Sequence, residues 1–267
     1  MAVETTLTSA KAWHPDVTAI LPSEIIPTAL VLTTSTVAGN VEGDEPAVRV
    51  PFVRSFGPVG FVDEGQPIPE SDGVLDEVVV RTGKVAALTT VSREMTMQPT
   101  GTTMITDAMT HEIIRKADAA YLANVSDPTG LLNTPKIVDG GTLAADATSG
   151  LIDALMSIES AGGKASVILA SPDAWATTLK GSTPLFERMT TAPEQMLYGV
   201  PVVVSSQMPA KTLLMFDRSA VLSSVGNVNV ARSDDAAFNA DAVMLRATFR
   251  FGWAVAHPER VVKLATA

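Results

Sequence analysis

Alternating hydrophobic and polar residues between 47 and 92 predict a long β-hairpin. The two stretches with partial alternation are Val48–Arg54 and Val78–Val91. An acidic segment rich in Gly and Pro separates them at residues 62–73 and is expected to form the tip. Because two strands of this length are only marginally stable alone, we expect the hairpin to lie on its own body or on another subunit.

A helical pattern follows at residues 103–124. Its apolar residues recur at steps of three and four and form one stripe, made of Ile105, Met109, Ile113, Ala117 and Ala120. The charged residues of the segment, Asp118 among them, are expected on the remaining surface of the helix. The sequence Asp127-Pro128-Thr129-Gly130 then ends the element.

Helices are predicted to alternate with strands between residues 149 and 216. Ser149 is a candidate cap for a helix that runs through Ile158 and ends at Ala161-Gly162-Gly163. A buried strand at Val167–Ala170 leads into a helix with Pro172 in its first turn. Further short strands at Pro201–Ser205 and Thr212–Phe216 complete a compact α/β unit.

The two ends of the chain carry weaker patterns. A short helix is predicted around Asp16–Leu21, and Pro22 keeps it from running further. The apolar residues of this N-terminal segment need a partner surface, either within the chain or on a neighbouring subunit. Near the C-terminus, strands are predicted at Val228–Val230, at Val243–Val255 with a turn at Gly252, and at Arg260–Leu264.

Composition narrows the class of protein. The chain has 267 residues, nearly half of them hydrophobic, which is typical of a globular protein with a sizeable core. Its formal net charge of −10 argues against general nucleic-acid binding, which depends on Lys and Arg. The absence of cysteine excludes disulfides and thiolate metal sites. The segment Met1–Lys11 lacks a signal-peptide pattern and no apolar run approaches twenty residues, so we expect a soluble protein made in the cytoplasm, with no membrane contact.

No catalytic, cofactor-binding or metal site is predicted, so the chain is not expected to be an enzyme. His111-Glu112 begins like a zinc-protease helix, but Arg115 occupies the position of the second ligand. His257 is expected to serve a turn before Pro258. Gly162–Ser166 resembles a phosphate-binding loop only in part, because the preceding Gly is missing and Ala165 separates Lys from Ser.

Five motifs, taken in order, resemble those of the major capsid protein of tailed bacteriophages of the Hong Kong 97 type. The resemblance covers roughly residues 50–264. It rests on Glu64–Asp72 at the loop tip, Val91–Glu94 closing that loop, Pro128–Asn133 after the long helix, Ser171–Trp175 at a strand-to-helix turn and Gly199–Val203 in a strand.

The resemblance implies an α+β fold of the Hong Kong 97 type. Its parts would be an N-terminal arm at 1–50, an extended hairpin loop at 51–95, a spine helix with the first part of a peripheral domain at 96–138, an α/β axial domain at 139–225, and return strands of the peripheral domain with a C-terminal strand at 226–267. The long N-terminal scaffolding region of the type member is missing. Either a separate scaffold is used, or this is a processed or naturally short form.

The resemblance also implies what holds the subunits together. In the type member a Lys and an Asn, assisted by a Glu, form an isopeptide between subunits, and the matching positions here are near Glu77, Asp241 and Thr248. None of these has the required chemistry, so a non-covalent shell is expected.

The loop-tip acids are the candidate contact residues. Their spacing is not that of a calcium-binding loop. They are instead expected to meet basic residues on the spine helix of a neighbour, at ~0.2–1 kcal/mol per exposed pair. The acids are Asp63, Glu64, Glu70 and Asp72, and the basic residues are Arg115 and Lys116.

The function implied is that of a self-assembling subunit of an icosahedral phage head. Many copies would form pentamers and hexamers and enclose double-stranded DNA without sequence-specific binding, with a scaffold, a portal and decoration proteins as further partners. The protein would be assembled in the cytoplasm of the bacterial host and would end in the virion. Two alternatives stay open: a shell subunit of an encapsulin-like compartment, and a small acidic α/β enzyme or ligand-binding protein.

Overall fold

The structure is a computed structural model of the chain, and it is a mixed α+β structure. It describes residues 17–20, 29–41, 45–57, 59–62, 64–65, 68, 70, 73–96, 99–143, 148–181 and 195–266. Two six-stranded sheets form its framework. Within the described residues, no helix is long and apolar enough to cross a membrane.

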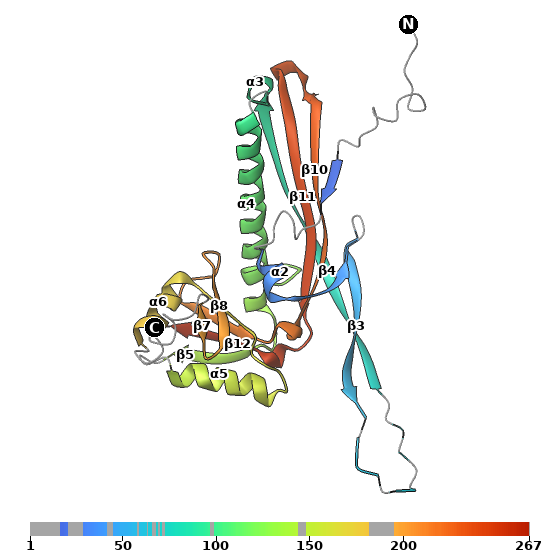
Figure 1. Cartoon of the computed structure of the whole chain (residues 1–267), viewed down its shortest axis with the longest axis vertical. Helices are drawn as coiled ribbons and strands as arrows, with labels where there is room; N and C mark the ends of the chain where they lie inside the picture. Colours follow the sequence, from blue (N-terminus) through green and yellow to red (C-terminus); the bar gives the residue numbers. More distant parts are fainter. Residues whose placement is uncertain are drawn as a thin grey trace.

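The first sheet carries the long helix α4 (Pro99–Ala123) along its length (Figure 1). In strand order it consists of β1 (Val17–Ile20), β10 (Val221–Ala237), β11 (Ala242–Val255), β4 (Gly73–Ser92) and β3 (Ala47–Phe56), and β2 (Thr36–Asn40) also pairs with β10. Helix α3 (Arg93–Thr96) links β4 to α4, η3 (Phe238–Ala240) joins β10 to β11, and helix α2 (Leu30–Thr34) packs against α4.

The apolar stripe of α4 packs on this sheet, as predicted. Ile113 and Ala117 are buried, whereas Ile105, Met109 and Ala120 are partly buried against the same cores. On the sheet side, alternate residues of β11 face the helix, because successive side chains of a strand point to opposite faces. They form a row of aromatic rings in which Tyr121 of α4 meets Trp253 edge-on, at 5.3 Å between ring centroids.

The second sheet forms a separate layer beside the lower end of α4 (Figure 1). Its order is β5 (Val138–Leu143), β12 (Val261–Thr266), β9 (Thr212–Phe216), β6 (Val167–Ala170), β8 (Val200–Val204) and β7 (Met196–Leu197). Helices α5 (Thr148–Ser160) and α6 (Pro172–Gly181) pack on it. Short 3₁₀ turns complete the chain at η1 (Leu131–Asn133), η2 (Arg218–Ala220) and η4 (Pro258–Arg260).

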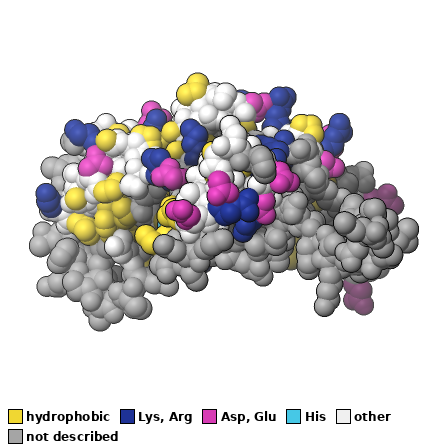
Figure 2. Space-filling model, turned by 90° about the horizontal axis from the view of Figure 1, so that it is seen from above, with side chains coloured by type: hydrophobic (Ala, Val, Ile, Leu, Met, Phe, Trp, Pro, Cys, Tyr) yellow, Lys and Arg dark blue, Asp and Glu magenta, His cyan; other side chains and the backbone are white. Residues whose placement is uncertain are grey.

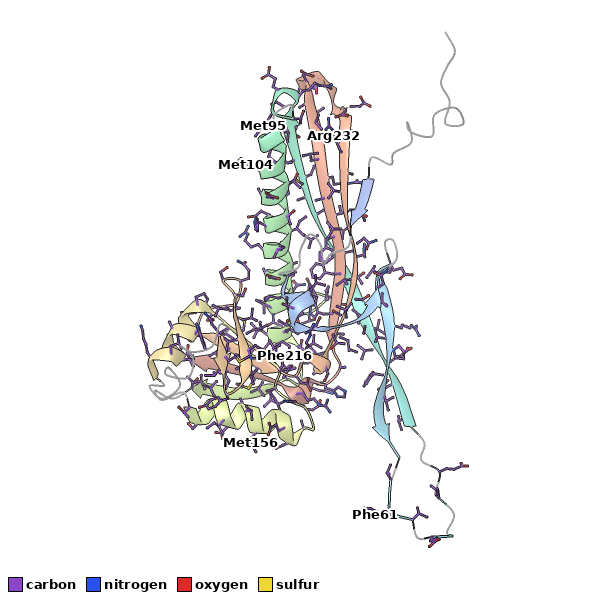
Figure 3. All side chains as sticks on the ribbon, viewed as in Figure 1. Phe61, Met95, Met104, Met156, Phe216 and Arg232 are labelled. Carbon is purple, nitrogen blue, oxygen red and sulfur yellow. The ribbon has the colours of Figure 1, made fainter. Side chains whose placement is uncertain are left out.

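Strands β6 and β9 are apolar at nearly every position because both of their faces are buried. Leu169 and Phe216 belong to the core under α4, whereas the neighbouring Ile168 and Met215 belong to the core under α5 and α6. Phe216 lies where the two layers meet (Figure 3). The second sheet therefore ties the two cores together, and the predicted strands at 167–170, 201–205 and 212–216 are confirmed with small shifts. Helix α5 begins at Thr148, so Ser149 lies in its first turn rather than capping it.

The predicted long hairpin is confirmed, and it lies on its own body over only half of its length. From Thr82 to Ser92, β4 pairs with β11 inside the first sheet. From Gly73 to Arg81 it pairs with β3 instead. This second half leaves the body and projects beyond it (Figure 1).

The helix predicted at Asp16–Leu21 is wrong. Residues Val17–Ile20 form β1, antiparallel to residues 228–231 of β10. Three of the four residues of β1 are β-branched, which favours extended backbone. Pairing with the edge of β10 then gives the backbone the hydrogen bonds that a single helical turn would provide only in part.

Two other expectations near the C-terminus also need correction. Strand β11 runs through Gly252, which pairs with Thr82, so no turn occurs there. Strand β10 spans Val221–Ala237 rather than three residues, because its polar residues are accommodated in the sheet. Ser223, for example, is buried and accepts a hydrogen bond from Ser35 Oγ at 2.7 Å.

Candidate assembly surfaces

The base of the projecting hairpin is anchored by a small apolar cluster. Val50 of β3, Val80 of β4 and Leu222 of β10 are buried together there. Phe52 adds an edge-on contact to the ring of His257, at 5.6 Å between centroids. Because these contacts join three parts of the chain, they set the direction in which the hairpin leaves the body.

The tip of the hairpin carries exposed hydrophobic residues. Val59 is 82% exposed, Ile68 is 81% exposed and Phe61 is fully exposed at 110% of its reference area. Figure 3 shows Phe61 at the far end of the hairpin, away from α4 and from the second sheet. Exposed hydrophobic side chains do not stabilise an isolated chain. Clustered exposure of this kind marks a surface that binds another protein.

The acidic side chains predicted at the tip are only partly visible. Glu64 and Glu70 are exposed, whereas Asp63 and Asp72 lie outside the described residues. The basic residues expected to meet them, Arg115 and Lys116, are exposed on α4. The hairpin points away from α4, so one chain does not bring the two groups together (Figure 1).

Arg115 already has a partner within its own helix. Its Nη2 and Nε atoms donate to Glu112 Oε2 at 2.6 and 3.1 Å, an i,i+3 pair. The hydrogen bond and the charge of Glu112 raise the pKa of the Arg115 guanidinium further above its usual value. Any acid arriving from outside would therefore share Arg115 with Glu112, and Lys116 is the simpler contact.

A groove runs between α4 and β4. It consists of two adjoining hollows of about 680 and 440 Å³, which share Val85, Lys116 and Ala119. Alanine side chains of α4 and residues Gly83–Ala87 of β4 form much of its lining. Lys84, Lys116 and Arg115 give it a basic border, with Glu112 and Asp127 as the acids on its lining.

Comparison with known protein families shows to which family the chain with these surfaces belongs. The model of the phage capsid family matches residues 35–266, which is most of the chain. The chain belongs to the phage capsid family. It is accordingly a shell subunit, and the exposed hairpin and groove are candidate contacts between the subunits of a shell.

Solved structures from phages and from a GTA capsid share the fold of this capsid-family chain. A chain of Gordonia phage Cozz aligns with a TM-score of 0.68 at 17% identity, covering 90% of this chain and 86% of that one. The capsid of an empty GTA particle aligns with a TM-score of 0.69 at 17% identity over 100% of both chains. A chain of Mycobacterium phage Bobi aligns with a TM-score of 0.67 at 17% identity, covering 100% and 99%. At these identities the likeness shows the fold alone, and no curated protein matches the chain.

The three positions matched to the isopeptide chemistry have local roles in this capsid subunit. Glu77 accepts a hydrogen bond from Arg49 across the hairpin at 3.0 Å. Asp241 pairs with Arg93 at 2.9 Å, which joins the β10–β11 turn to α3. Thr248 is buried in β11. That the shell is held non-covalently remains a prediction.

Asp118 is a residue whose role sequence reasoning missed. It was expected on the solvent-facing side of the helix, but it is only 8% exposed and its Oδ1 accepts a hydrogen bond from the Leu30 N–H of α2 at 2.8 Å. Burial raises the pKa of its carboxyl to about 6, against the opposing effect of that hydrogen bond. The available signal was its spacing from Tyr121 and Leu122, which follow three and four residues later and therefore share its face of the helix.

The C-terminal end of α2 makes further polar contacts, through Thr34 and Ser35. Thr34 Oγ1 lies 3.2 Å from the hydroxyl of Tyr121, and Arg218 donates to the carbonyl of Ser35 at 2.9 Å. These contacts attach the segment before β2 to α4, through Tyr121, and to η2, through Arg218. They are structural contacts rather than a catalytic constellation.

The structure describes both of the histidines that were considered as candidate ligands or turn residues, His111 and His257. No group of three or more His, Cys, Asp and Glu side chains is placed there to hold a metal ion. His111 is an exposed residue of α4. His257 lies directly before η4 with its Nδ1 3.0 Å from Glu259 Oε1, in agreement with the turn role expected for it.

Charged side chains are mixed in sign when the molecule is viewed from the end that carries α3. Seen from above, described Lys and Arg side chains are interspersed with Asp and Glu and with hydrophobic residues (Figure 2). Arg232 and the exposed Met95 and Met104 lie toward this end (Figure 3). Arg232 is paired with Asp234 at 2.8 Å, so the charge of this arginine is offset locally.

Proposed function

We propose that this chain is the repeating major subunit of an icosahedral phage head with the Hong Kong 97-type arrangement. The observation that carries the proposal is the hairpin that leaves the body and ends in exposed hydrophobic residues. An isolated domain has no use for such an element. A subunit that overlaps its neighbour buries it, at ~25 cal/mol per Å² of apolar area.

The proposed arrangement divides the chain as the resemblance implies. The arm comprises residues 1–50, the extended loop 51–95, the spine region 96–138, the axial domain 139–225, and the return strands with the C-terminal strand 226–267. Pentamers and hexamers would form around the axial domains. In support, the capsids of native and empty GTA particles, which share the fold of this chain, have structures that were determined with C5 symmetry.

The proposed shell encloses double-stranded DNA without binding it tightly. A net charge of −10 supports this, because tight non-specific binding needs many Lys and Arg contacts to phosphates. The shell is formed in the cytoplasm of the bacterial host and becomes part of the virion. Scaffold, portal and decoration proteins are the partners that such a head would use, and the role proposed is structural rather than enzymatic.

Electron microscopy of the purified protein tests the proposal. Uniform closed shells, or rings of five and six subunits, are the expected result. A protein that stays a monomer or dimer under all assembly conditions, with a scaffold supplied as well, would contradict it. Shells that contain a cargo enzyme instead of DNA would assign the chain to a compartment.

Contacts between the acidic tip and the spine helix of a neighbour are proposed to support the shell. Reversing the charge of Glu64 and Glu70 together to Lys should lower the denaturant concentration at which shells dissociate. Each exposed pair contributes only ~0.2–1 kcal/mol, but every subunit of the shell repeats it. The unassembled subunit should unfold as the parent does, since both residues are exposed at the tip.

The matched control reverses Asp153 and Glu159, two exposed acids of α5, and so makes the same change in net charge. Light scattering during a denaturant titration follows dissociation. If the tip variant and the control dissociate at the same concentration as the parent, the acidic tip has no part in assembly.

A further inference from the structure

Helix α2 has a sequence that does not favour a helix by itself. It has five residues, far fewer than the ~12–15 that an isolated helix needs in water. Val31, Thr33 and Thr34 are β-branched and lose side-chain freedom in a helix. The N-cap residue, Ala29, makes no side-chain hydrogen bond, and α2 has no acid in its first turn and no base in its last. Its helical conformation therefore depends on other parts of the chain.

The start of α2 is held by the long helix α4, beside which it lies (Figure 1). The N–H of Leu30 donates to Asp118 Oδ1 at 2.8 Å, across 88 residues of sequence. A carboxylate at the start of a helix satisfies a free N–H and interacts favourably with the helix dipole. Asp118 thus does from α4 what a capping side chain at Ala29 would do from within the sequence of α2.

The end of α2 is held by a residue at the junction of the two sheets. Arg218 belongs to η2, which connects β9 of the second sheet to β10 of the first. Its Nε donates to the carbonyl of Ser35 at 2.9 Å and its Nη2 to that of Leu32 at 3.3 Å, across 183 and 186 residues of sequence. A cation at this end matches the negative end of the helix dipole. A guanidinium therefore holds the end of α2, as a carboxylate holds its start.

The strand that follows, β2, depends on α2 for its attachment. Four of its five residues are exposed, so β2 buries little apolar surface where it pairs with residues 222–225 of β10. Helix α2, by contrast, buries three of its five residues. Val41, directly after β2, is buried again. Between residues 30 and 40, the apolar contacts with the body are therefore concentrated in α2.

We propose that α2 is a latch that opens as one unit together with β2, and that it stays closed only while Asp118 and Arg218 hold its two ends. The two residues belong to different parts of the fold, α4 and the β9–β10 junction. A displacement of one part relative to the other breaks one of the contacts and opens the latch. Residues 30–40 then detach from β10, while both sheets keep their cores. This inference goes beyond the proposed function, because it concerns the single subunit and needs no shell.

Reaction of a buried cysteine with a thiol reagent measures this opening, because the chain contains no cysteine of its own. Val31→Cys places the probe at a buried position of α2 and does not add volume. Val261→Cys, buried in the same core on β12, is the reference. In unassembled subunits under native conditions, Val31→Cys should react roughly tenfold or more faster than Val261→Cys. Equal rates would show that α2 opens only when the whole core opens, and would overturn the proposal.

The bond at the start of α2 is tested by two variants that both remove the charge of Asp118. Asp118→Asn keeps an oxygen that accepts from the Leu30 N–H, whereas Asp118→Ala keeps none. With the Val31→Cys probe, Asp118→Ala should react about tenfold faster than Asp118→Asn, which corresponds to ~1.4 kcal/mol. Equal rates in the two variants would mean that this hydrogen bond does not hold the latch closed, contrary to the proposal.

The contacts at the other end are tested by Arg218→Met, which keeps an apolar stem and removes the donors. Reaction of the Val31→Cys probe should become roughly threefold or more faster. The matched control is Arg232→Met, at another exposed arginine, which should leave the rate unchanged. An unchanged rate in Arg218→Met, or an equal rise in the rate of Val261→Cys, would contradict the latch.

Hydrogen exchange gives a second measurement that needs no cysteine. The Leu30 N–H lies at the start of α2, and the N–H groups of Leu32 and Thr33 follow within the helix, where both donate to the carbonyl of Ala29. If α2 opens as one unit, these three amides share one opening equilibrium. Arg218→Met should then speed the exchange of all three by the same factor. Faster exchange of Leu32 and Thr33 with an unchanged Leu30 amide would show that the two ends open independently, and would overturn the proposal.

Discussion

Replacing Asp118 by asparagine should make the dissociated subunit more stable at neutral pH. The buried carboxyl has a pKa of about 6, raised from 3.8 mainly by burial. At neutral pH it is charged in a site that disfavours charge. A shift of about two units corresponds to ~3 kcal/mol, which sets the upper limit of the gain. Asparagine keeps an oxygen that accepts from the Leu30 N–H, so α2 stays attached.

The sign of the pH dependence follows from proton linkage. Because the pKa of Asp118 is higher in the folded chain than in the unfolded chain, the folded state binds more protons between about pH 4 and pH 6. This carboxyl therefore destabilises the fold at neutral pH, and the penalty disappears as the pH falls through 6 toward 4. The parent and the Asp118→Asn variant should converge in stability near pH 4.

Thermal unfolding of dissociated subunits across this pH range measures the effect. For a chain of this size, a gain of ~3 kcal/mol raises the Tm by roughly 6–12 °C at neutral pH. Asp153→Asn, at an exposed position of α5, is the control and should leave the Tm unchanged. A variant less stable than the parent at every pH would mean that the charge of Asp118 is itself needed to hold α2.

The elements predicted correctly from the sequence are those with a strong hydrophobic pattern of their own. The spine helix and strands β6 and β9 are strongly periodic or continuously apolar, and each was placed within a few residues. Strand β1 was mistaken for a helix because four residues carry little pattern, and pairing with β10 decides their conformation. Strand β2 and most of β10 were missed because their polar residues are satisfied by partners far away in sequence.

Of the candidate surfaces, those set by composition or by helix pattern could be predicted from the sequence, whereas those set by strand pairing could not. The acidic tip is evident from composition, and the position of Arg115 and Lys116 on the spine helix follows from its pattern. The change of partner along β4 could not be predicted, because it depends on where β3 stops and on where β11 pairs with the other edge. Exposure of Phe61 likewise becomes meaningful only when the hairpin is seen to leave the body.

Gly252 should be among the positions in the first sheet least tolerant of substitution. A Cβ there would overlap the carbonyl oxygen of Arg81 and lie 2.8 Å from its carbonyl carbon. Both atoms belong to the backbone, so the clash is relieved only if β4 moves away from β11. That movement would occur where the hairpin leaves the body. We expect Gly252→Ala to lower the free energy of unfolding by ~1–3 kcal/mol or more and to impair shell formation.

Gly83 supplies the matched control, because it lies on β4 close to the same point. A Cβ at Gly83 would meet only the side chain of Pro128, at an ordinary 3.7 Å. Gly83→Ala should therefore be at least as stable as the parent, because alanine lowers the entropy of the unfolded chain. Denaturant unfolding of dissociated subunits measures the free energy of unfolding of both variants. Electron microscopy shows whether Gly252→Ala impairs shell formation. Equal stability of both variants would show that β4 and β11 separate at little cost, and that the direction of the hairpin is not set at Gly252.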